Sequence, residues 1–494
     1  MNQSLDYRRK LLILIFLTMI ISLAKAQPNL AFYPFDSQFN ASSYNPAFLT
    51  SPEKFTFSIF PIGGISIGYN NQAEIRNMIS KFPSGITTDN DYRNAISSMV
   101  DQSAFHQNIE VLLLSFTYRS KVGFFNFRIK DNQFFSALTD GQVTRFIFMS
   151  DIRSVVIDQI QYLPVQAIHY REYSLGYSFK SRMNRFSGGI RAKLYFGKSA
   201  FFSGISGLIQ NQSNEYALKT SGLVYISFPE KKVINPNETA TLSNFSTSKI
   251  KDYFLNAGNP GFGVDLGIKY KITPDLSFSL SVIDLGKINW KTNLNSKYFD
   301  GEYKFSGATI KSSNEGGTQV ITKTIDNYSY SDSISQLFNL SYERSSFSRQ
   351  LPFTIYAGVK YELNPNLSIG FTDRFFSVKD LAYNSFSAAA NFNVNKKISI
   401  STGYSVIGNS YINIPLAIYF KKDFGQVYIG SDNMASFLFP KLNQFAGISF
   451  GACFYLFAKR DLFGKASDNF PFYKPRKIKK NQKTGLILQP YPEY

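Results

Sequence analysis

Residues 261–290, GFGVDLGIKYKITPDLSFSLSVIDLGKINW, carry the pattern that predicts the fold of the whole chain. In the first half every second residue is apolar, namely Phe262, Val264, Leu266, Ile268 and Tyr270. In the second half serines alternate with Leu276, Phe278, Leu280 and Val282. A period of two gives a strand one apolar and one polar face, and Pro274 with Asp275 marks a tight turn between two such strands. Long strands joined by a minimal turn favour a membrane barrel over a soluble sandwich.

The same hairpin pattern recurs along the chain. Six tight turns each join two alternating segments, at residues 120–123, 181–184, 272–275, 363–366, 395–397 and 422–423. A first strand from residue 55 and a last strand up to residue 457 raise the count to fourteen, an even number as in single-chain bacterial barrels. Longer segments alternate with the turns, the longest being residues 72–107, 132–166, 198–260 and 291–351. We therefore predict an all-β fold, a closed antiparallel transmembrane barrel of about 14 strands with long extracellular loops and both termini in the periplasm.

The alternation also predicts the side chains that face lipid: Phe125, Phe127, Tyr173, Tyr177, Phe262, Leu266, Leu280, Phe392 and Phe454. Val282 and Ile283 interrupt it, so we expect a β-bulge that turns Asp284 into the lumen, because a carboxylate facing lipid is costly. Pro415 would remove a hydrogen bond from its strand, and Pro61 followed by Gly63-Gly64 predicts a kink in the first strand.

The two ends of the chain lack the barrel pattern. Residues 1–26 are typical of a signal peptide, with a basic start, an apolar core and the cleavage signal Ala24-Lys25-Ala26. No later run of about 18 apolar residues predicts a transmembrane helix. We expect an exported chain in which residues 27–54 form an N-terminal periplasmic segment, residues 55–457 the outer-membrane barrel and residues 458–494 a basic periplasmic tail.

Composition agrees with a chain that faces both lipid and water. Aromatic residues make up 16% of the sequence, yet mean hydropathy is only −0.14. The formal net charge of +19 would suit an acidic ligand, lipopolysaccharide phosphates or nucleic acid, but it also fits solvated turns and a solvated tail. The sequence has no nucleic-acid-binding motif, so we expect no nucleic-acid partner. Cys453 is the single cysteine, which excludes an intrachain disulfide.

Charged residues on the polar faces of three consecutive strands predict a cluster in the lumen, formed by Glu172, Arg191, Lys193 and Asp265. It would be either a lattice of salt bridges that stiffens the wall or an anion-selective constriction. The only histidines are His106, at the start of the second strand, and His169, expected on the outward face near the rim. Neither belongs to a pattern typical of a catalytic or metal site, so we predict no enzymatic activity, metal or cofactor.

Several short motifs keep their order along the chain: EYSLGY at residues 172–177, GFGVDLG at 261–267, IDLG at 283–286 with INW at 288–290, and SDN at 431–433. Through them the chain resembles a family of outer-membrane barrel proteins of unknown function from bacteria with the type IX secretion system. That family is similar in turn to barrels of the long-chain fatty-acid transporter type. Asn45-Pro46-Ala47 resembles the NPA segment that opens such barrels, which implies that the N-terminal segment folds inward as a hatch.

Two functions remain open. The tail carries a basic run followed by an apolar end, which predicts docking to a periplasmic or outer-membrane protein through Leu486, Ile487, Leu488, Pro490, Tyr491, Pro492 and Tyr494. With the long loops, this favours a non-catalytic structural or adaptor subunit of an outer-membrane assembly, in contact with outer-membrane lipid and lipopolysaccharide. The alternative is an outer-membrane channel or transporter for small or hydrophobic molecules, because fourteen strands enclose more space than wall side chains fill.

Overall fold

The computed structural model describes residues 30–49, 54–71, 102–140, 160–181, 185–212, 215–228, 253–305, 308–315, 318–325, 341–343, 345–378, 381–408, 410–438 and 445–456. The predicted signal peptide, the tail and the docking motif at its end lie outside the described residues. Among the described helices, none is long and apolar enough to cross a membrane.

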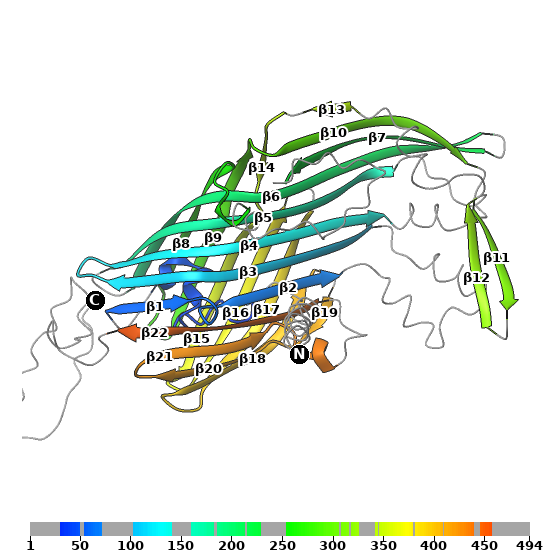
Figure 1. Cartoon of the computed structure of the whole chain (residues 1–494). Helices are drawn as coiled ribbons and strands as arrows, with labels where there is room; N and C mark the ends of the chain where they lie inside the picture. Colours follow the sequence, from blue (N-terminus) through cyan, green and yellow to red (C-terminus); the bar gives the residue numbers. More distant parts are fainter. Residues whose placement is uncertain are drawn as a thin grey trace, which may run out of the picture.

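One antiparallel sheet closes on itself and forms a barrel with fourteen wall positions, which confirms the predicted architecture (Figure 1). The first seven positions are β1 (Phe55–Ile59) with β2 (Ile65–Asn71), β3 (Gln102–Arg119), β4 (Phe124–Asp140), β5 (Ile160–Lys180), β6 (Phe186–Gln212), β8 (Pro260–Lys271) and β9 (Leu276–Trp290). The other seven are β15 (Phe353–Asn364), β16 (Leu367–Val378), β17 (Leu381–Asn393), β18 (Ile398–Ile407), β19 (Ser410–Asn413) with β20 (Leu416–Lys422), β21 (Gly425–Ser431) and β22 (Phe445–Leu456). Because β22 pairs with β1 and β2, the barrel wall has no free edge.

Two wall positions are each occupied by a pair of short strands. β1 and β2 both pair with β3 and β22, and the chain between them contains Pro61 and the Gly63-Gly64 pair. β19 and β20 both pair with β18 and are separated at Pro415, which has no N–H for the ladder. The predicted kink in the first strand and the predicted irregularity at Pro415 are both confirmed.

The tight turns lie at one end of the barrel, and several strands continue past the other end, the loop end (Figure 1). The prediction that long loops begin near residues 132 and 198 was wrong, since β4 continues to Asp140 and β6 to Gln212. Outside the lipid belt a strand keeps its hydrogen-bond ladder without needing an apolar face, so the alternation disappears before the strand does.

The sheet extends beyond the loop end because β6 pairs with β7 (Glu215–Ser227), β7 with β10 (Leu294–Phe305), and β10 with β13 (Ser341–Glu343). A separate hairpin consists of β11 (Ala308–Glu315) and β12 (Thr318–Ile325). β14 (Phe347–Gln350) pairs with β9, and the short helix α7 (Ala435–Leu438) precedes β22. The two longest predicted loops therefore do contain strands that project from the barrel.

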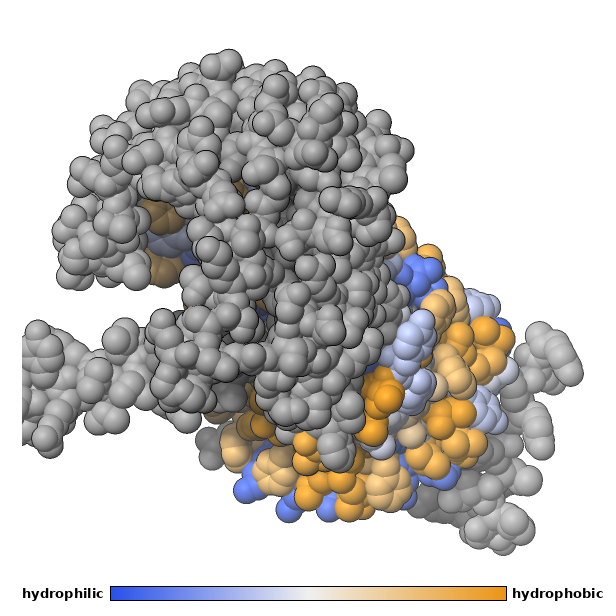
Figure 2. All heavy atoms as spheres, turned by 90° about the vertical axis from the view of Figure 1, so that its right-hand side faces the viewer, coloured by the Kyte–Doolittle hydropathy of each residue, from blue (hydrophilic) through white to orange (hydrophobic). Residues whose placement is uncertain are grey.

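The outer face of the barrel is apolar, as the alternation predicts. Phe262, Leu266 and Phe392 are 59%, 45% and 49% exposed. Phe125, Phe127 and Leu280 are also exposed, while Tyr173, Tyr177 and Phe454 lie against neighbouring rings of the outer surface. In Figure 2 hydrophobic side chains dominate the coloured part of the outer wall.

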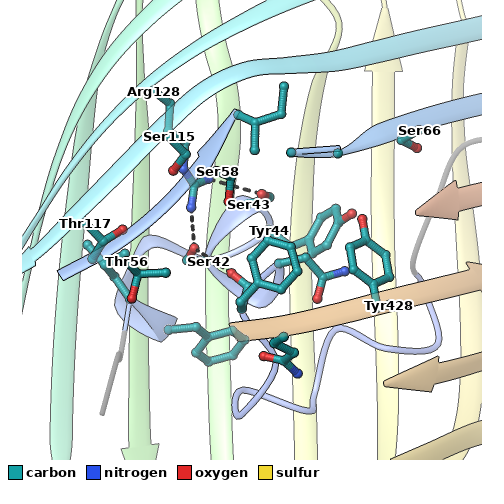
Figure 3. Close-up of a pocket in the computed structure, with 18 of the residues that line it drawn as sticks. Ser42, Ser43, Tyr44, Thr56, Ser58, Ser66, Ser115, Thr117, Arg128 and Tyr428 are labelled. Carbon is teal, nitrogen blue, oxygen red and sulfur yellow. Dashed lines mark hydrogen bonds between the residues drawn. The ribbon is translucent and has the colours of Figure 1, made fainter. Parts of the chain in front are cut away.

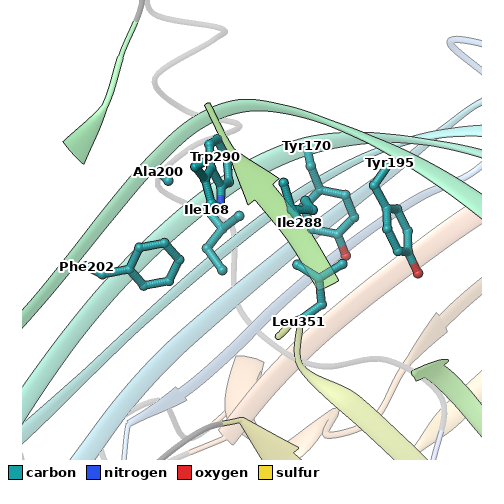
Figure 4. Packing of buried hydrophobic residues seen from close by; sticks show 8 residues of the cluster. All are labelled: Ile168, Tyr170, Tyr195, Ala200, Phe202, Ile288, Trp290 and Leu351. Carbon is teal, nitrogen blue, oxygen red and sulfur yellow. The ribbon is translucent and has the colours of Figure 1, made fainter. Parts of the chain in front are cut away.

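An apolar cluster fills part of the lumen near the loop end. Its members are Ile168, Tyr170, Tyr195, Ala200, Phe202, Ile288, Trp290 and Leu351 (Figure 4). Trp290 packs onto Gly197 of β6, where an added Cβ would lie 2.6 Å from the indole ring. The glycine therefore lets the largest side chain of the cluster reach the wall.

Candidate functional site

The space between the barrel walls is occupied by residues 30–49, here called the plug segment. It contains two short 3-10 helices, η1 (Ala41–Ser43) and η2 (Pro46–Phe48), and it lies inside the barrel against β5, β6 and β8. The Asn45 side chain accepts a hydrogen bond from the Ala47 N–H at 2.9 Å, and Pro46 begins η2, as favoured at a helix start. The Asn45-Pro46-Ala47 motif thus shapes the turn that faces the wall. Its role as a hatch stays a prediction.

Asn45 also binds the plug segment to the wall. Its Nδ2 donates to the carbonyl oxygens of Ile268 at 3.2 Å and Leu280 at 3.3 Å, and to the Tyr33 hydroxyl at 3.0 Å. These two carbonyls belong to β8 and β9, the strands of one hairpin. One buried amide therefore connects both strands of that hairpin to the plug segment.

Glycines in the wall make room for this close approach. A Cβ at Gly189 of β6 would lie 2.3 Å from the carbonyl carbon of Pro46, and one at Gly267 of β8 would lie 2.0 Å from the Asn45 side-chain oxygen. Such distances are far inside van der Waals contact. At these two positions the plug segment fits only because the wall residue is glycine.

Ion pairs hold the first part of the plug segment. Asp36 contacts Lys269 of β8 and, at 2.9 Å, Lys360 of β15. Burial alone would raise the pKa of Asp36, but the two lysines reverse this and hold the pKa well below its ordinary range. Asp36 is therefore charged at neutral pH and serves as an electrostatic anchor.

Arginines hold the second part. Arg191 donates to the Ser42 carbonyl at 2.5 Å, while Arg128 of β4 donates to the Ser43 hydroxyl at 3.1 Å and to the Ser42 hydroxyl (Figure 3). The Ser281 hydroxyl donates to the Tyr44 carbonyl at 2.7 Å. The plug segment is thus attached around much of the barrel circumference, through these polar groups and through apolar contacts of Leu30, Phe32 and Phe48.

The structure brings the four residues of the predicted lumen cluster together. The Arg191 guanidinium lies 2.8 Å from one oxygen of Asp265, and the Lys193 ammonium lies 2.8 Å from the other. Lys193 is also 3.5 Å from Glu172. All four side chains are at most 3% exposed, so they form one desolvated network beneath the plug segment.

Asp284 joins this network through the predicted bulge. The register of β8 against β9 shifts between Val264 and Leu266, and Asp284 has a φ of 64°, a conformation that aspartate tolerates better than most residues. Its N–H donates to Asp265 at 2.7 Å, and its carboxylate contacts Lys193. The expectation that Asp284 turns inward is confirmed.

Two cavities with many polar lining groups lie beside the plug segment. The turn-side cavity, of about 100 Å³, is lined by residues such as Thr56, Thr117, Arg128 and Tyr428 (Figure 3). The loop-side cavity, of about 70 Å³, is lined by residues of β3, β4, β5, β9, β15 and β16. Four residues line both cavities: Ser43, Tyr44, Glu110 and Lys130. Tyr44 and the Glu110–Lys130 ion pair, 3.1 Å long, therefore lie between them.

Sequence reasoning missed Asp36 and Tyr44 because the plug segment has no periodic pattern, and the residues that bind it become visible only when distant strands meet. Burial raises the pKa of Tyr44 well above its ordinary value, so the phenol stays neutral.

The histidines lie apart from each other. His106 is inside the barrel and bonds the Tyr383 hydroxyl at 2.8 Å, whereas His169 contacts Asp131 and Tyr253. His169 shares the parity of Tyr173, but its side chain is buried by Tyr253 and Asp131 rather than exposed on the outer surface. Within the part of the chain that the structure describes, no group of His, Cys, Asp and Glu is arranged to hold a metal ion.

Residues 46–432 match the family described as "Family of unknown function (DUF5723)". The chain belongs to this family. No curated protein sequence matches it. This family membership confirms the resemblance to an uncharacterised barrel family, while the association with type IX secretion stays a prediction.

Several solved barrels are similar in fold. The Pseudomonas putida toluene transporter TodX is 11% identical with a TM-score of 0.35, over 84% of this chain and 92% of its own. The Ralstonia pickettii toluene transporter TbuX is 12% identical with a TM-score of 0.36, over 87% and 95%. A Pseudomonas aeruginosa FadL homologue is 11% identical with a TM-score of 0.36, over 87% and 98%. At this identity the likeness concerns the fold alone. A closed barrel with an apolar outer face is a protein of the bacterial outer membrane.

Proposed function

We propose that this protein is an outer-membrane channel or transporter for small molecules, closed by its plug segment. The observation that carries the proposal is the pair of cavities, which share Tyr44 of the plug segment as a common wall. Fourteen strands enclose a lumen that wall side chains do not fill, and residues 30–49 occupy its centre. Displacing Tyr44 would join the two cavities into one path.

The chemistry of the contacts supports a plug segment that can move. Asp36, Ser42 and Asn45 bind the wall through ion pairs and hydrogen bonds, and water can replace such partners when the segment shifts. The wall beneath is also polar, with buried groups such as Arg128 and Ser281. Phe32, Phe35 and Phe48 of the plug segment also pack against apolar wall residues, so its movement carries the cost of exposing them.

The lining also supports a polar cargo. TodX and TbuX are described as toluene transporters, and a path for such a molecule would need apolar walls. The two cavities here display Arg128, Lys130 and Glu110 together with several serines and asparagines. We infer that small polar solutes, rather than hydrocarbons, pass through this barrel.

The topology supports an orientation. β1 begins and β22 ends at the barrel end that carries the tight turns. Short turns face the periplasm in outer-membrane barrels. We therefore place both termini in the periplasm, with β7, β10 and the β11–β12 hairpin on the outside, near lipopolysaccharide. The proposal assigns no catalytic step to the protein.

Planar-bilayer conductance of the full chain tests the proposal. Gly189→Ala places a methyl group against the Pro46 backbone, so it should displace the plug segment and raise conductance several-fold over the wild type. Gly176→Ala is the matched control, because its Cβ would meet Arg191 at an ordinary 3.5 Å and leave the plug segment in place. If both variants fold and neither differs from the wild type in conductance, the plugged-channel proposal is wrong.

A further inference from the structure

The loop-side cavity contains buried donors without acceptors. Arg374 of β16 is 2% exposed, and its Nη2 donates to the Ser385 hydroxyl at 3.2 Å, but its Nε has no hydrogen-bond partner within the described ranges. Among the described residues no carboxylate lies within ion-pair distance of Arg374. Asn132 of β4 lines the same cavity, and its Nδ2 also has no hydrogen-bond partner in the part of the chain that the structure describes. A buried guanidinium without a counter-ion is costly, and an acceptor group in this cavity would remove that cost.

The same cavity also contains a carboxylate that is open to a ligand. Glu172 and Asp284 line it, and both belong to the buried network that contains Asp265, Arg191 and Lys193. Asp284 keeps 30% of its side chain exposed, so its carboxylate is open to the cavity even though it also contacts Lys193. The other carboxylate there, Glu110, already has the Lys130 ammonium as a partner.

We propose that the loop-side cavity binds the zwitterionic head group of an amino acid or short peptide. The carboxylate of such a ligand would accept hydrogen bonds from Arg374 and Asn132, and its ammonium would lie against Asp284. A guanidinium suits a carboxylate because it presents parallel N–H donors. This inference rests on the proposed channel function and names the class of solute.

Size and charge support this choice over the alternatives. A cavity of about 70 Å³ has room for a few water molecules, so it suits a small ligand or the head group of a larger one. A phosphate would bring two negative charges next to Glu110, Glu172 and Asp284. A simple amine would leave Arg374 without a counter-ion. Only a ligand with both charges supplies a counter-ion for Arg374 and a cation for Asp284.

Equilibrium dialysis of the detergent-solubilised full chain with radiolabelled glycine tests the proposal, with acetate and methylammonium as competitors. Each competitor carries one of the two charges, so each should need a concentration at least about tenfold higher than unlabelled glycine to displace the label. Displacement by acetate as efficient as by glycine would reduce the site to an anion site. Absence of saturable glycine binding would overturn the proposal.

Variants connect the binding to the named residues. Arg374→Gln and Asp284→Asn should each weaken glycine binding about tenfold or more. Asp373→Asn is the matched control, because Asp373 is the next residue on β16 but is exposed on the outer face. Equal binding by all three variants would contradict the assignment.

The result is separable from the channel itself. If the chain binds glycine but Gly189→Ala produces no conductance, the binding-site proposal stands and the channel proposal fails. If Gly189→Ala conducts but the chain shows no saturable glycine binding, the channel proposal stands and the binding-site proposal fails.

Discussion

The two faces of the same strands follow different rules. On the outer face of β8, Leu266 is 45% exposed and needs only to be apolar, because lipid contacts any hydrocarbon side chain equally well. One residue further, Gly267 faces the lumen, where a single added carbon would collide with Asn45. The choice of residue on the outer face is thus constrained only by the surrounding lipid. On the inner face each residue is constrained by the particular groups that it contacts. A simple period of two can predict the first but not the second.

The largest expected effect comes from the inner face. Lys193→Met removes the cation that contacts Glu172, Asp265 and Asp284, and it should destabilise the barrel by about 3–5 kcal/mol, as for other buried ion pairs that lose one partner. Urea unfolding followed by heat-modifiable gel migration measures this. Adding Asp284→Asn to Lys193→Met should recover part of the loss, because one uncompensated carboxylate disappears. Additive losses would show that the cluster is not coupled.

A smaller effect is expected on the outer face. Leu266→Arg should cost about 2–4 kcal/mol, because the charge would lie in the lipid belt. Gly267 is not a suitable inner control for this substitution, since an arginine there would displace the plug segment. Gln426→Arg is the better inner control, because Gln426 lines the turn-side cavity and an arginine has room there. Equal losses at the two positions would contradict the assignment of faces.

The pH dependence of the plug segment should be weaker still. The pKa of Asp36 is held below its ordinary value, so its ion pairs contribute fully above about pH 4 and are lost only as the pH falls further towards the folded-state pKa. The protection factors of residues 30–49 in hydrogen exchange, which correct for the pH dependence of the intrinsic rate, should therefore stay high at pH 5 and fall only in stronger acid. Asp36→Asn should make exchange faster at neutral pH and remove this acid transition. Loosening of the wild-type segment between pH 7 and 5 would assign the anchor to another group.

The smallest effect on the barrel is expected from the tail. Deleting residues 485–494 should leave heat-modifiable migration unchanged, because β22 already closes the wall at Leu456. If the tail docks a partner, the deletion should abolish copurification of at least one periplasmic or outer-membrane protein. An unchanged set of copurifying proteins would leave the channel function without an adaptor role.

Period-two alternation was enough to predict the strands within the lipid belt, the number of wall positions and the side chains that face lipid, but not the strand extensions beyond the loop end. Even Asp284 could be placed inside the lumen, because a broken alternation next to a carboxylate has few acceptable solutions in a membrane. The members of the lumen cluster were predicted correctly, because Glu172, Arg191 and Lys193 lie on the polar faces of neighbouring strands. These features depend on local chemistry and on a uniform solvent, which each stretch of sequence carries by itself.

The interior required the tertiary structure. Asp36 meets Lys360, more than three hundred positions away in the sequence, and Arg374 meets its cavity only because β3, β4, β9 and β16 surround the same lumen. The plug segment has no periodic pattern. Its position depends on the space that wall glycines leave and on hydrogen-bond donors from distant strands. The sequence alone therefore determined which faces meet lipid and water. Closure of the barrel decided which charges meet in the lumen, because it arranges strands that are distant in the sequence around one plug segment.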